Sequence, residues 1–453
     1  FKINSTFNNF IKNINMVFLI DHSGRAGNGF FLSIFDQHPE VLTCHWVHYI
    51  YSYIITEFGD SRTFNSNKAY QFIIKHSYFR YVFSRLDDDV RERLVRFGGD
   101  PSSQIDRSKA NDVFKEIVLS NKKISRRKLI IAAYFAYAVG IDRDIKNIKY
   151  ILIADSATLR NENKLKRASG KVIHEIIWDF PNAKGISLVR DPRADFASSR
   201  HQFVNSQGNM YGVRFGNYIT ELIKLYNMRL NMNQGCVYLY WLIFFKSGAR
   251  IMWALKHQYK NQFITIRNED LNITFIPTIK SICRWLNVSF WDTWKDEAYV
   301  PTSVGKPWRG TGAYNNRYQT FKYGPLKNDL QKIADKVTGP NIYVTQRWKS
   351  RMSKNEIKVI EILFNQEMKD LSYDSASQLD VNNNISTLIW NLIFPFQGEI
   401  PSMRWIINGK NIGLIEILQR LFYTLTFMPF YVLSRMILLR LYCNGFFKND
   451  EIQ

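Results

Sequence analysis

The sequence predicts an α/β protein in which helices flank a central parallel β-sheet, with a helical insertion and a helical C-terminal extension. An apolar run at 17–20 passes through a glycine-containing loop into a helical pattern. Further apolar runs of strand length end just before Asp155 and Arg190. The chain has 453 residues, 46% of them hydrophobic, which suffices for one large α/β domain with additions or for two or three domains.

The first predicted elements are a strand, a loop and a helix within residues 17–39. Val17–Ile20 is an apolar run of the kind that forms a buried strand. Helical spacing then follows in Phe30, Phe31, Ile34 and Phe35. A loop in this position aims backbone N–H groups at the start of the helix, where the peptide dipoles favour an anion such as phosphate. Gly24, Gly27 and Gly29 allow close backbone approach there.

The loop differs from a nucleotide-binding P-loop in two functional positions. Its glycine spacing fits the first half of that motif, but Phe30 and Phe31 stand where the lysine and the serine or threonine belong. Without these groups to reach terminal phosphates and hold Mg²⁺, hydrolysis of ATP or GTP is disfavoured. The cationic side chain of this loop is Arg25 instead.

The stretch resembles the 5′-phosphosulfate-binding loop of sulfotransferases, written R-S-G-T-T and followed by a helix that ends in D-x-H-P. Arg25–Gly29 take the five loop places, and Asp36–Pro39 reproduce the end of the helix. Asn28 and Gly29 stand where the family has two threonines, so backbone N–H groups, the Asn28 amide and Ser23 would take over their contacts. The resemblance implies donor contacts from Ser23, Gly24, Arg25, Ala26, Gly27, Asn28, Gly29 and Phe30. The alternative is a glycine-rich turn that only joins a core strand to a core helix.

Residues 45 to about 145 are rich in aromatic and basic side chains with helical periodicity, which predicts a helical insertion. Gly98–Pro101 is typical of a turn within it, and Leu129–Val139 is predicted to be a buried helix. The insertion would either wall a substrate cleft or pack as an appendage. With the insertion included, the sulfotransferase-like α/β domain is predicted to span residues 1–340.

A second core strand is predicted at Ile148–Ala154, and Asp155 follows it directly. Ligands of parallel α/β sheets bind beyond the carboxyl ends of the strands, so Asp155 is well placed for chemistry. Sulfotransferases often carry a lysine, or a lysine with a nearby histidine, at the end of a comparable strand. This sequence has Asp155 there instead of a lysine. Asp155 is predicted to be either a carboxylate general base or a helix N-cap.

A third core strand is predicted at Ala183–Val189, closing into Arg190 and a helix. Asp191 as N-cap and Pro192 at the first helical position mark the switch from strand to helix. Arg190 and Ser198 match the two contact positions of the sulfotransferase 3′-phosphate segment, R-x-P-x-x-x-x-x-S, which this stretch resembles. A guanidinium suits bidentate phosphate recognition, and a hydroxyl adds a further donor. A surface ion pair is the alternative for the arginine.

A fourth strand is predicted at Gln262–Arg267, and Asn268–Leu271 after it is similar to the family's Y-E-D-L, which we expect to hold loops by hydrogen bonds. Gly305–Tyr314 resembles the basic loop that closes over the nucleotide in sulfotransferases. Its candidate phosphate contacts are Lys306, Arg309 and Gly310. Trp308 would stack on a base or line the cleft. A plain surface loop rich in glycine and proline is the alternative.

Residues 341–453 are predicted to form a helical C-terminal region that is strongly apolar at Leu388–Phe396 and Ile412–Leu441. The uncharged run Leu421–Ser434 is shorter than the roughly 20 residues that span a bilayer, and Pro429 lies within it. We therefore predict an element that lies on a membrane surface or packs on a partner subunit. A buried pair of core helices is the alternative.

The formal net charge of +22 indicates an anionic partner, such as an acidic polysaccharide, a phosphorylated nucleotide or an anionic membrane. No nucleic-acid module is recognisable, so no nucleic acid partner is predicted. The four cysteines show no metal-ligand spacing, which predicts no metal site and favours a reducing, cytoplasmic location. No secretory signal pattern is found, but the sequence begins at Phe1 rather than Met, which leaves an upstream segment and a Golgi location open.

The resemblance implies an enzyme that transfers a sulfuryl group in line from 3′-phosphoadenosine 5′-phosphosulfate (PAPS) to an acceptor hydroxyl. Arg25 would stabilise charge on the bridging oxygen without a metal. His45 is the first candidate for the general base, because it lies close to the place after the D-x-H-P helix where some of these enzymes carry a catalytic glutamate. His48 and Asp155 are the other candidates. Size, the aromatic insertion and family habit favour a carbohydrate acceptor. The alternatives are a nucleotide-dependent phosphotransferase and a catalytically inactive nucleotide-binding or membrane-associated scaffold.

Overall fold

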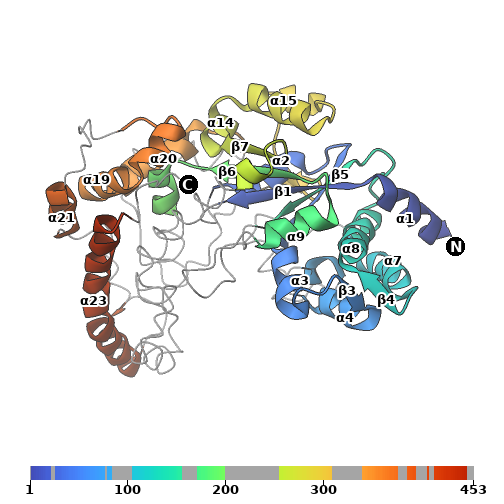
Figure 1. Cartoon of the computed structure of the whole chain (residues 1–453), viewed down its shortest axis with the longest axis horizontal. Helices are drawn as coiled ribbons and strands as arrows, with labels where there is room; N and C mark the ends of the chain where they lie inside the picture. The colour runs from blue at the N-terminus through green and yellow to red at the C-terminus, as the bar shows by residue number, and fades with distance from the viewer. Residues whose placement is uncertain are drawn as a thin grey trace.

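A five-stranded parallel sheet forms the centre of the molecule (Figure 1). Its strands, in spatial order, are β2 (Val41–His48), β5 (Tyr150–Ala154), β1 (Asn15–Asp21), β6 (Lys184–Val189) and β7 (Phe263–Arg267). The computed structural model describes residues 2–21, 26–76, 79–83, 105–155, 171–198, 255–308, 339–375, 385–393, 406–407 and 413–445. The prediction of an α/β fold around a central parallel sheet is confirmed.

Strand β1 lies in the middle of the sheet and is apolar on both faces. Successive side chains of a strand point to opposite faces, and helices cover both faces of this sheet. Met16, Phe18 and Ile20 therefore belong to the hydrophobic core on one face, and Val17 and Leu19 to the core on the other. This explains why the sequence shows a continuous apolar run here rather than an alternating one.

The first face of the sheet is covered by the N-terminal helix, the insertion and a helix that precedes β6 (Figure 1). The helices are α1 (Lys2–Asn13), α3 (Ile50–Phe58), α4 (Ser66–Lys75), α5 (Arg80–Phe83), α7 (Arg107–Leu119), α8 (Arg126–Gly140) and α9 (Lys171–Asp179). A short antiparallel pair, β3 (Thr63–Asn65) with β4 (Lys123–Ser125), lies among them. The described part of the insertion is thus mainly helical, as predicted.

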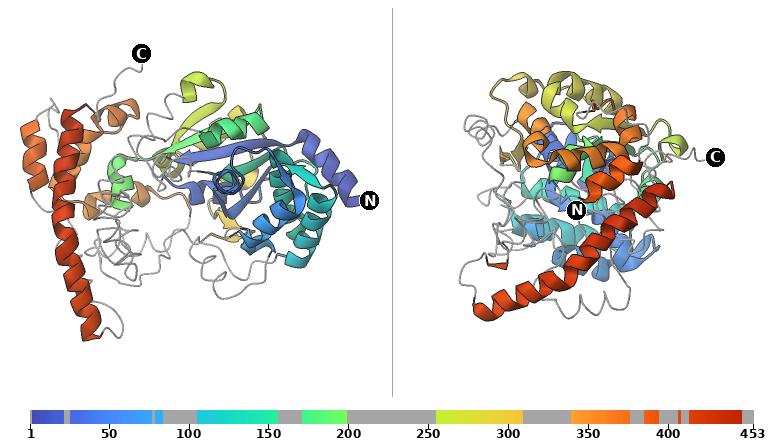
Figure 2. Two further views of the ribbon diagram at one scale, coloured as in Figure 1. Left: turned by 60° about the horizontal axis from the view of Figure 1, so that its bottom comes forward. Right: turned by 90° about the vertical axis from the view of Figure 1, so that its left-hand side faces the viewer.

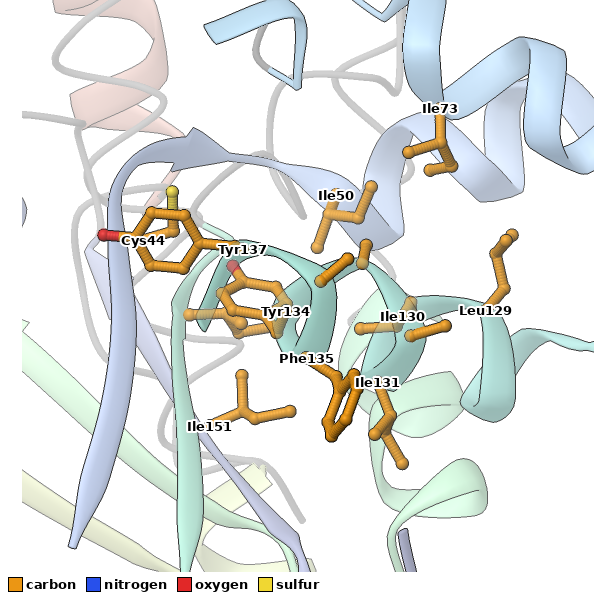
Figure 3. Packing of buried hydrophobic residues seen from close by; sticks show 14 of the residues in the cluster. Cys44, Ile50, Ile73, Leu129, Ile130, Ile131, Tyr134, Phe135, Tyr137 and Ile151 are labelled. Atoms are coloured by element: carbon orange, nitrogen blue, oxygen red, sulfur yellow. The ribbon is translucent and has the colours of Figure 1, made fainter. Parts of the chain in front are cut away.

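Helix α8 forms the centre of the core on this face. Its side chains are almost all buried, and Ser125 caps its N-terminus by accepting a hydrogen bond from the Lys128 N–H. Tyr134 and Tyr137 lie on the side of the helix that faces Cys44 of β2 (Figure 3). The insertion is therefore anchored to the sheet through β2.

Strand β2 was not predicted, because polar residues interrupt its apolar run and residues 45–48 were assigned to the insertion. In the sheet, Thr43 lies opposite Leu152 and His48 lies opposite Ala154. More residues of β2 than of β5 thus lie between these two pairs, so β2 bulges. The sheet therefore continues as far as the second of the two histidines that are candidate bases.

The second face of the sheet is covered by α2 (Asn28–Phe35), α15 (Phe275–Leu286) and the 3₁₀-helix η2 (Asp292–Lys295), with α14 (Asn268–Ile273) directly after β7. A hairpin of β8 (Thr302–Ser303) and β9 (Lys306–Pro307) packs beside α2. Figure 1 shows α14 and α15 on the opposite side of the sheet from α3, α4 and α7.

The described part of the C-terminal region is mainly helical, as predicted. Its elements are α17 (Ile342–Gln346), α18 (Trp348–Arg351), α19 (Lys354–Leu363), α20 (Asn365–Asp370), α21 (Ile385–Ile393) and α23 (Leu414–Cys443). Helices α17 and α19 contact residues that follow β6, and Leu371 after α20 contacts the end of β7. Helices α21 and α23 lie at the opposite end of the molecule from α1 (Figures 1 and 2). None of the helices that the structure describes is both long and apolar enough to cross a membrane.

Candidate functional site

The parallel strands bring the candidate residues to one edge of the sheet. Asp21 at the end of β1 pairs with Leu188 of β6, so the loop after β1 and Arg190 after β6 start on neighbouring strands. Asp155 and Asn268 follow β5 and β7 at the same edge. This carboxyl edge is where parallel α/β sheets bind ligands.

The loop after β1 enters α2 through Gly27, which caps the helix with a left-handed backbone at φ 107°. The side chain of Asn268 donates from Nδ2 to the carbonyl oxygen of Ala26 over 2.8 Å. A Cβ on Gly27 would lie 2.2 Å from this Nδ2 atom, closer than any real contact. Glycine is therefore required here both by the backbone angle and by the neighbouring amide.

Two features of this loop suit an anionic group at the start of α2. The first backbone N–H groups of α2 have no partner within the helix, and no side chain caps them. The amide oxygen of Asn28 is buried and has no hydrogen-bond partner among the described residues. A primary amide turned by 180° puts its NH₂ in the same place, so Asn28 offers a donor to a ligand oxygen there. The residues present thus fit the 5′-phosphate end of PAPS.

The other loop candidates divide between the start of α2 and the part of the chain that is not described. Gly29 is partly buried in the first turn of α2, and Phe30 is buried beside it. The candidates outside the described residues are Ser23, Gly24, Arg25, Arg309 and Gly310. Their assignments stay predictions.

The segment after β6 places Arg190 at the strand end, where the residue is 9% exposed. Its Nη2 atom donates to the carbonyl oxygen of Val344 in α17 over 3.0 Å. The charge of Arg190 also lies near enough to Glu269 to lower the pKa of that carboxyl. Ser198 is partly buried at the end of the helical residues 192–198.

A buried ion-pair network begins one residue after Arg190. The Asp191 carboxylate caps the following helix, as predicted, by accepting from the Arg193 N–H over 2.8 Å. The Arg193 guanidinium pairs with Asp191 at 2.7 Å and with Glu361 of α19 at 2.5 Å. It also lies 4.2 Å over the Trp348 ring. The C-terminal helices are thus joined to the sheet through buried charge.

Glu269 ties the end of β7 to this segment. One carboxylate oxygen accepts from the Asp191 N–H over 3.1 Å, and the other accepts from the Tyr373 hydroxyl over 2.8 Å. Burial raises the pKa of Glu269, although the charge of Arg190 and these hydrogen bonds act in the opposite direction. Asn268 and Glu269 are consecutive, so one short segment contacts both candidate phosphate-binding segments.

Asp155 is 1% exposed and supports helix α3. Its carboxylate accepts from the Tyr51 N–H at 2.8 Å, the Ser52 N–H at 3.2 Å and the Ser52 hydroxyl at 2.5 Å. The two N–H groups belong to the first turn of α3, where backbone donors have no partner within the helix, so Asp155 caps a helix far away in the sequence. Burial raises the pKa of Asp155 to about 6, against the effect of these hydrogen bonds.

The two candidate histidines lie on β2. The backbone of His48 pairs with Ala154, which brings it next to Asp155, and His45 lies in the bulged stretch. The structure thus brings the backbones of His48 and Asp155 together.

The D-x-H-P end of α2 is a structural anchor. The Asp36 carboxylate accepts from the Gly305 N–H of the β8–β9 hairpin over 2.8 Å. The His38 ring accepts from the Glu40 N–H at Nδ1 and donates from Nε2 to the Ser289 carbonyl over 3.0 Å. Burial lowers the pKa of His38 to about 4, so the ring is neutral at physiological pH.

Lys306 is exposed in the β8–β9 hairpin, beside the end of α2. Trp308 follows and is buried against Phe30 in the first turn of α2, with ring centroids 5.8 Å apart. The chain therefore runs from the far end of α2 back toward the loop between residues 305 and 308.

Sequence reasoning assigned no individual role to Asn268, Asn272, Val344 or Glu361. The Y-E-D-L-like pattern indicated only that Asn268–Leu271 holds loops by hydrogen bonds, and Asn268 does so. Contacts from α17 and α19 join residues far apart in the chain, so no local spacing could reveal them.

No protein-family model and no curated protein sequence matches the chain. Among solved structures, it is similar to the sulfotransferase domain of the Synechococcus olefin synthase, with 12% identity, a TM-score of 0.42, and coverage of 80% of this chain and 96% of that chain. It is also similar to the sulfotransferase domain from the curacin biosynthetic pathway, with 14% identity, a TM-score of 0.42, and coverage of 80% of this chain and 98% of that chain. A sulfotransferase from Mycobacterium avium matches with 12% identity, a TM-score of 0.29, and coverage of 63% of this chain and 68% of that chain. At these scores, the function has to be argued from the site itself.

Proposed function

We propose that this protein is a sulfotransferase that moves the sulfuryl group of PAPS to an acceptor hydroxyl. The observation that carries the proposal is that β1 and β6, after which the two predicted phosphate-binding segments follow, are neighbouring parallel strands. Asn268 contacts the first segment and Glu269 contacts the second. A nucleotide with an anionic group at each end of its adenosine suits this arrangement.

When bound, the donor supplies the sulfuryl group: the acceptor oxygen bonds to sulfur as the bond from sulfur to the 5′-phosphate oxygen breaks. We assign Arg25 and the Asn28 amide to the 5′-phosphosulfate, where fixed donors stabilise the charge that develops on the leaving oxygen. We assign Arg190 and Ser198 to the 3′-phosphate. The loop candidates Lys306, Arg309 and Gly310 would complete the phosphate contacts.

The acceptor hydroxyl gives its proton to a positioned base, and we propose His45, with His48 as the second candidate. Asp155 is the third, but its oxygens already accept three hydrogen bonds within the protein. We expect His45→Ala to lose most sulfuryl transfer and to keep donor affinity, since the base does not hold the nucleotide. The same split for His48→Ala alone would move the role to that residue.

A binding experiment tests the donor. Calorimetry of the full chain should detect 3′-phosphoadenosine 5′-phosphate (PAP), the product that the donor leaves, and much weaker binding of ATP. Tight binding of ATP without binding of PAP would overturn the sulfotransferase proposal and favour a phosphotransferase. The missing lysine and serine or threonine of the loop argue against that second function.

A transfer experiment separates an enzyme from an inactive scaffold. We propose a carbohydrate acceptor, because the net charge of +22 suits an acidic polysaccharide. Labelled sulfate should pass from PAPS to a member of a glycan panel, and Arg25→Ala should lower the rate by roughly 10²–10³ because a charge-stabilising donor is lost. Binding of PAP without labelling of any acceptor would favour the scaffold.

We also propose that the first half of α23 rests on an anionic membrane surface. Its exposed apolar side chains recur at helical spacing: Leu414, Ile415, Leu418, Leu421, Phe422 and Leu425. The Glu416–Arg420 ion pair lies on another side, with Arg420 buried. This helix thus turns apolar groups outward, and the positive net charge suits anionic lipids.

The membrane proposal is tested by sedimentation with vesicles that contain phosphatidylserine. Leu418 and Phe422 are 56% and 60% exposed, so Leu418→Glu with Phe422→Glu should release the protein. Gln419→Glu adds a negative charge at a neighbouring exposed position and should release much less. Equal sedimentation of all three proteins, or of a chain cut before Ile412, would overturn the proposal.

We propose a cytoplasmic location as well. Cys283 and Cys443 are free thiols in the part of the chain that the structure describes, which suits a reducing compartment.

A further inference from the structure

Three buried asparagines form a continuous chain of hydrogen bonds from the C-terminal region to the loop after β1. The backbone N–H of Asn341 donates to Asn272 Oδ1 over 3.0 Å. Asn272 Nδ2 donates to Asn268 Oδ1 over 3.2 Å and to its carbonyl oxygen over 2.8 Å. Asn268 Nδ2 donates in turn to the Ala26 carbonyl over 2.8 Å. We call Asn341, Asn272 and Asn268 the asparagine relay.

The direction of the asparagine relay is fixed by its two ends. The Asn341 N–H can only donate, and the Ala26 carbonyl can only accept. Each side-chain amide between them therefore presents oxygen to the preceding donor and nitrogen to the following acceptor. Turning either amide would bring two donors or two acceptors together in a buried place, which is costly. Asn272 therefore sets which end of the Asn268 amide faces the loop.

The asparagine relay orients the peptide group that enters the cap of α2. In a trans peptide, the C=O and the following N–H point in opposite directions. With the Ala26 carbonyl held toward Asn268, the N–H of Gly27 points away from Asn268. A glycine at this position leaves room for the amide, since a Cβ would lie 2.2 Å from Asn268 Nδ2. The position of the Asn268 amide therefore requires a glycine at residue 27.

We propose that Asn268, oriented by Asn272, is a positioning residue that aims the Gly27 N–H at the anionic group of the donor. The identity of that donor rests on the function proposed above. Asn272 stands in an N-x-T sequon, but its side chain has a structural role. The amide is buried, and both its oxygen and its nitrogen form hydrogen bonds within the protein. The segment that starts the relay also supplies the Val344 carbonyl to Arg190, so α17 supports both phosphate-binding segments.

The test measures PAP affinity and loop protection in the same full-length variants. Asn268→Ala and Asn272→Ala should each bind PAP about tenfold more weakly, the loss expected for one oriented hydrogen bond. If the two residues act as one relay, the double variant should lose no more than the stronger single variant. Amides of the loop and first turn of α2 should exchange faster with deuterium in both variants, without ligand. Asn391→Ala is the control, because Asn391 is equally buried in α21 and donates to Thr387 there.

Asn268→Asp separates orientation from loss of volume. Its carboxylate faces the Ala26 carbonyl without a donor, but the protonated acid can donate as the amide does. Its PAP affinity relative to the unchanged protein should therefore recover between about pH 8 and about pH 5, because burial raises the pKa of such an acid. A variant that only disturbs packing shows no such recovery.

The outcomes distinguish the relay from the donor assignment. Absence of PAP binding in the unchanged protein overturns the donor assignment, and deuterium exchange then decides the relay without any ligand. Unchanged loop exchange in folded Asn268→Ala and Asn268→Asp overturns the relay. Unchanged PAP affinity in both variants overturns the aiming of Gly27 at the donor.

Discussion

The two segments assigned to the donor are held in different ways. The loop after β1 is held at Ala26 by a neutral amide, that of Asn268. The residues after β6 are held by buried charges, with Arg193 between Asp191 and Glu361. Both segments lie at the same edge of the sheet, on neighbouring strands.

Because of this difference, we expect the stability of the fold and the binding of the ligand to depend on different residues. A neutral hydrogen bond contributes about 1 kcal/mol net. Removing one partner of a buried ion pair costs about 3–5 kcal/mol, because the remaining charge is left without compensation. We therefore expect changes in the second segment to act mainly on folding, and changes in the first to act mainly on affinity for the nucleotide.

The largest effect is expected from Arg193→Ala, which leaves Asp191 and Glu361 buried without their cation. The free energy of unfolding should fall by about 3–5 kcal/mol. Urea unfolding followed by circular dichroism measures this loss. Lys109→Ala is the matched control, because it removes an exposed lysine paired with Asp142 and should leave the unfolding midpoint nearly unchanged. Equal midpoint shifts in both variants would contradict the contrast between the two segments.

A smaller effect is expected at the end of β5, where Asp155 is a buried charge held by neutral donors. Its pKa of about 6 lies above the ordinary 3.8, so the folded state binds the proton more tightly than the unfolded chain. Ionised Asp155 therefore costs stability above pH 6, and this cost, about 2–3 kcal/mol, disappears as the pH falls toward 4.

The measurement is the difference in unfolding free energy between the unchanged protein and Asp155→Asn across this pH range. The unchanged protein should gain stability relative to Asp155→Asn on acidification. Asp112→Asn alters the same charge at an exposed position of α7 and should leave the pH profile as it was. Parallel profiles for the protein and Asp155→Asn would show that the buried carboxyl carries no such cost.

Local sequence patterns were sufficient to predict most strands of the sheet and the helix cap after β6. The four strands predicted from apolar runs, β1, β5, β6 and β7, all exist, and β5 begins two residues later than expected. Asp191 caps a helix as its position before Pro192 predicted. These features depend on neighbours in the sequence, so the sequence shows them directly.

The contacts that hold the two segments could not be predicted in this way. Asn268 and Ala26 are 242 positions apart, and Arg193 and Glu361 are 168 positions apart. Pairing across such distances depends on the order of strands in the sheet, which a single sequence does not reveal. Asp155 shows the same limit, since the helix that it caps precedes it by about a hundred residues.

The smallest effect on stability, with a clear effect on binding, is expected from Gly27→Ala. Its left-handed backbone should cost an alanine about 1–2 kcal/mol of unfolding free energy. The new Cβ must also displace the Asn268 amide, so PAP affinity should fall by about tenfold or more. Urea unfolding and calorimetry on the same samples measure the two effects.

Gly59→Ala separates backbone strain from the contact with Asn268. Gly59 also has a positive φ, 62°, but a Cβ there would meet no atom within 4 Å. Gly59→Ala should therefore lose stability through backbone strain, while its affinity for PAP stays unchanged. Equal losses of affinity in both variants would trace the effect to general destabilisation. A loss confined to Gly27→Ala would trace the effect to the start of α2, where the new Cβ meets the Asn268 amide.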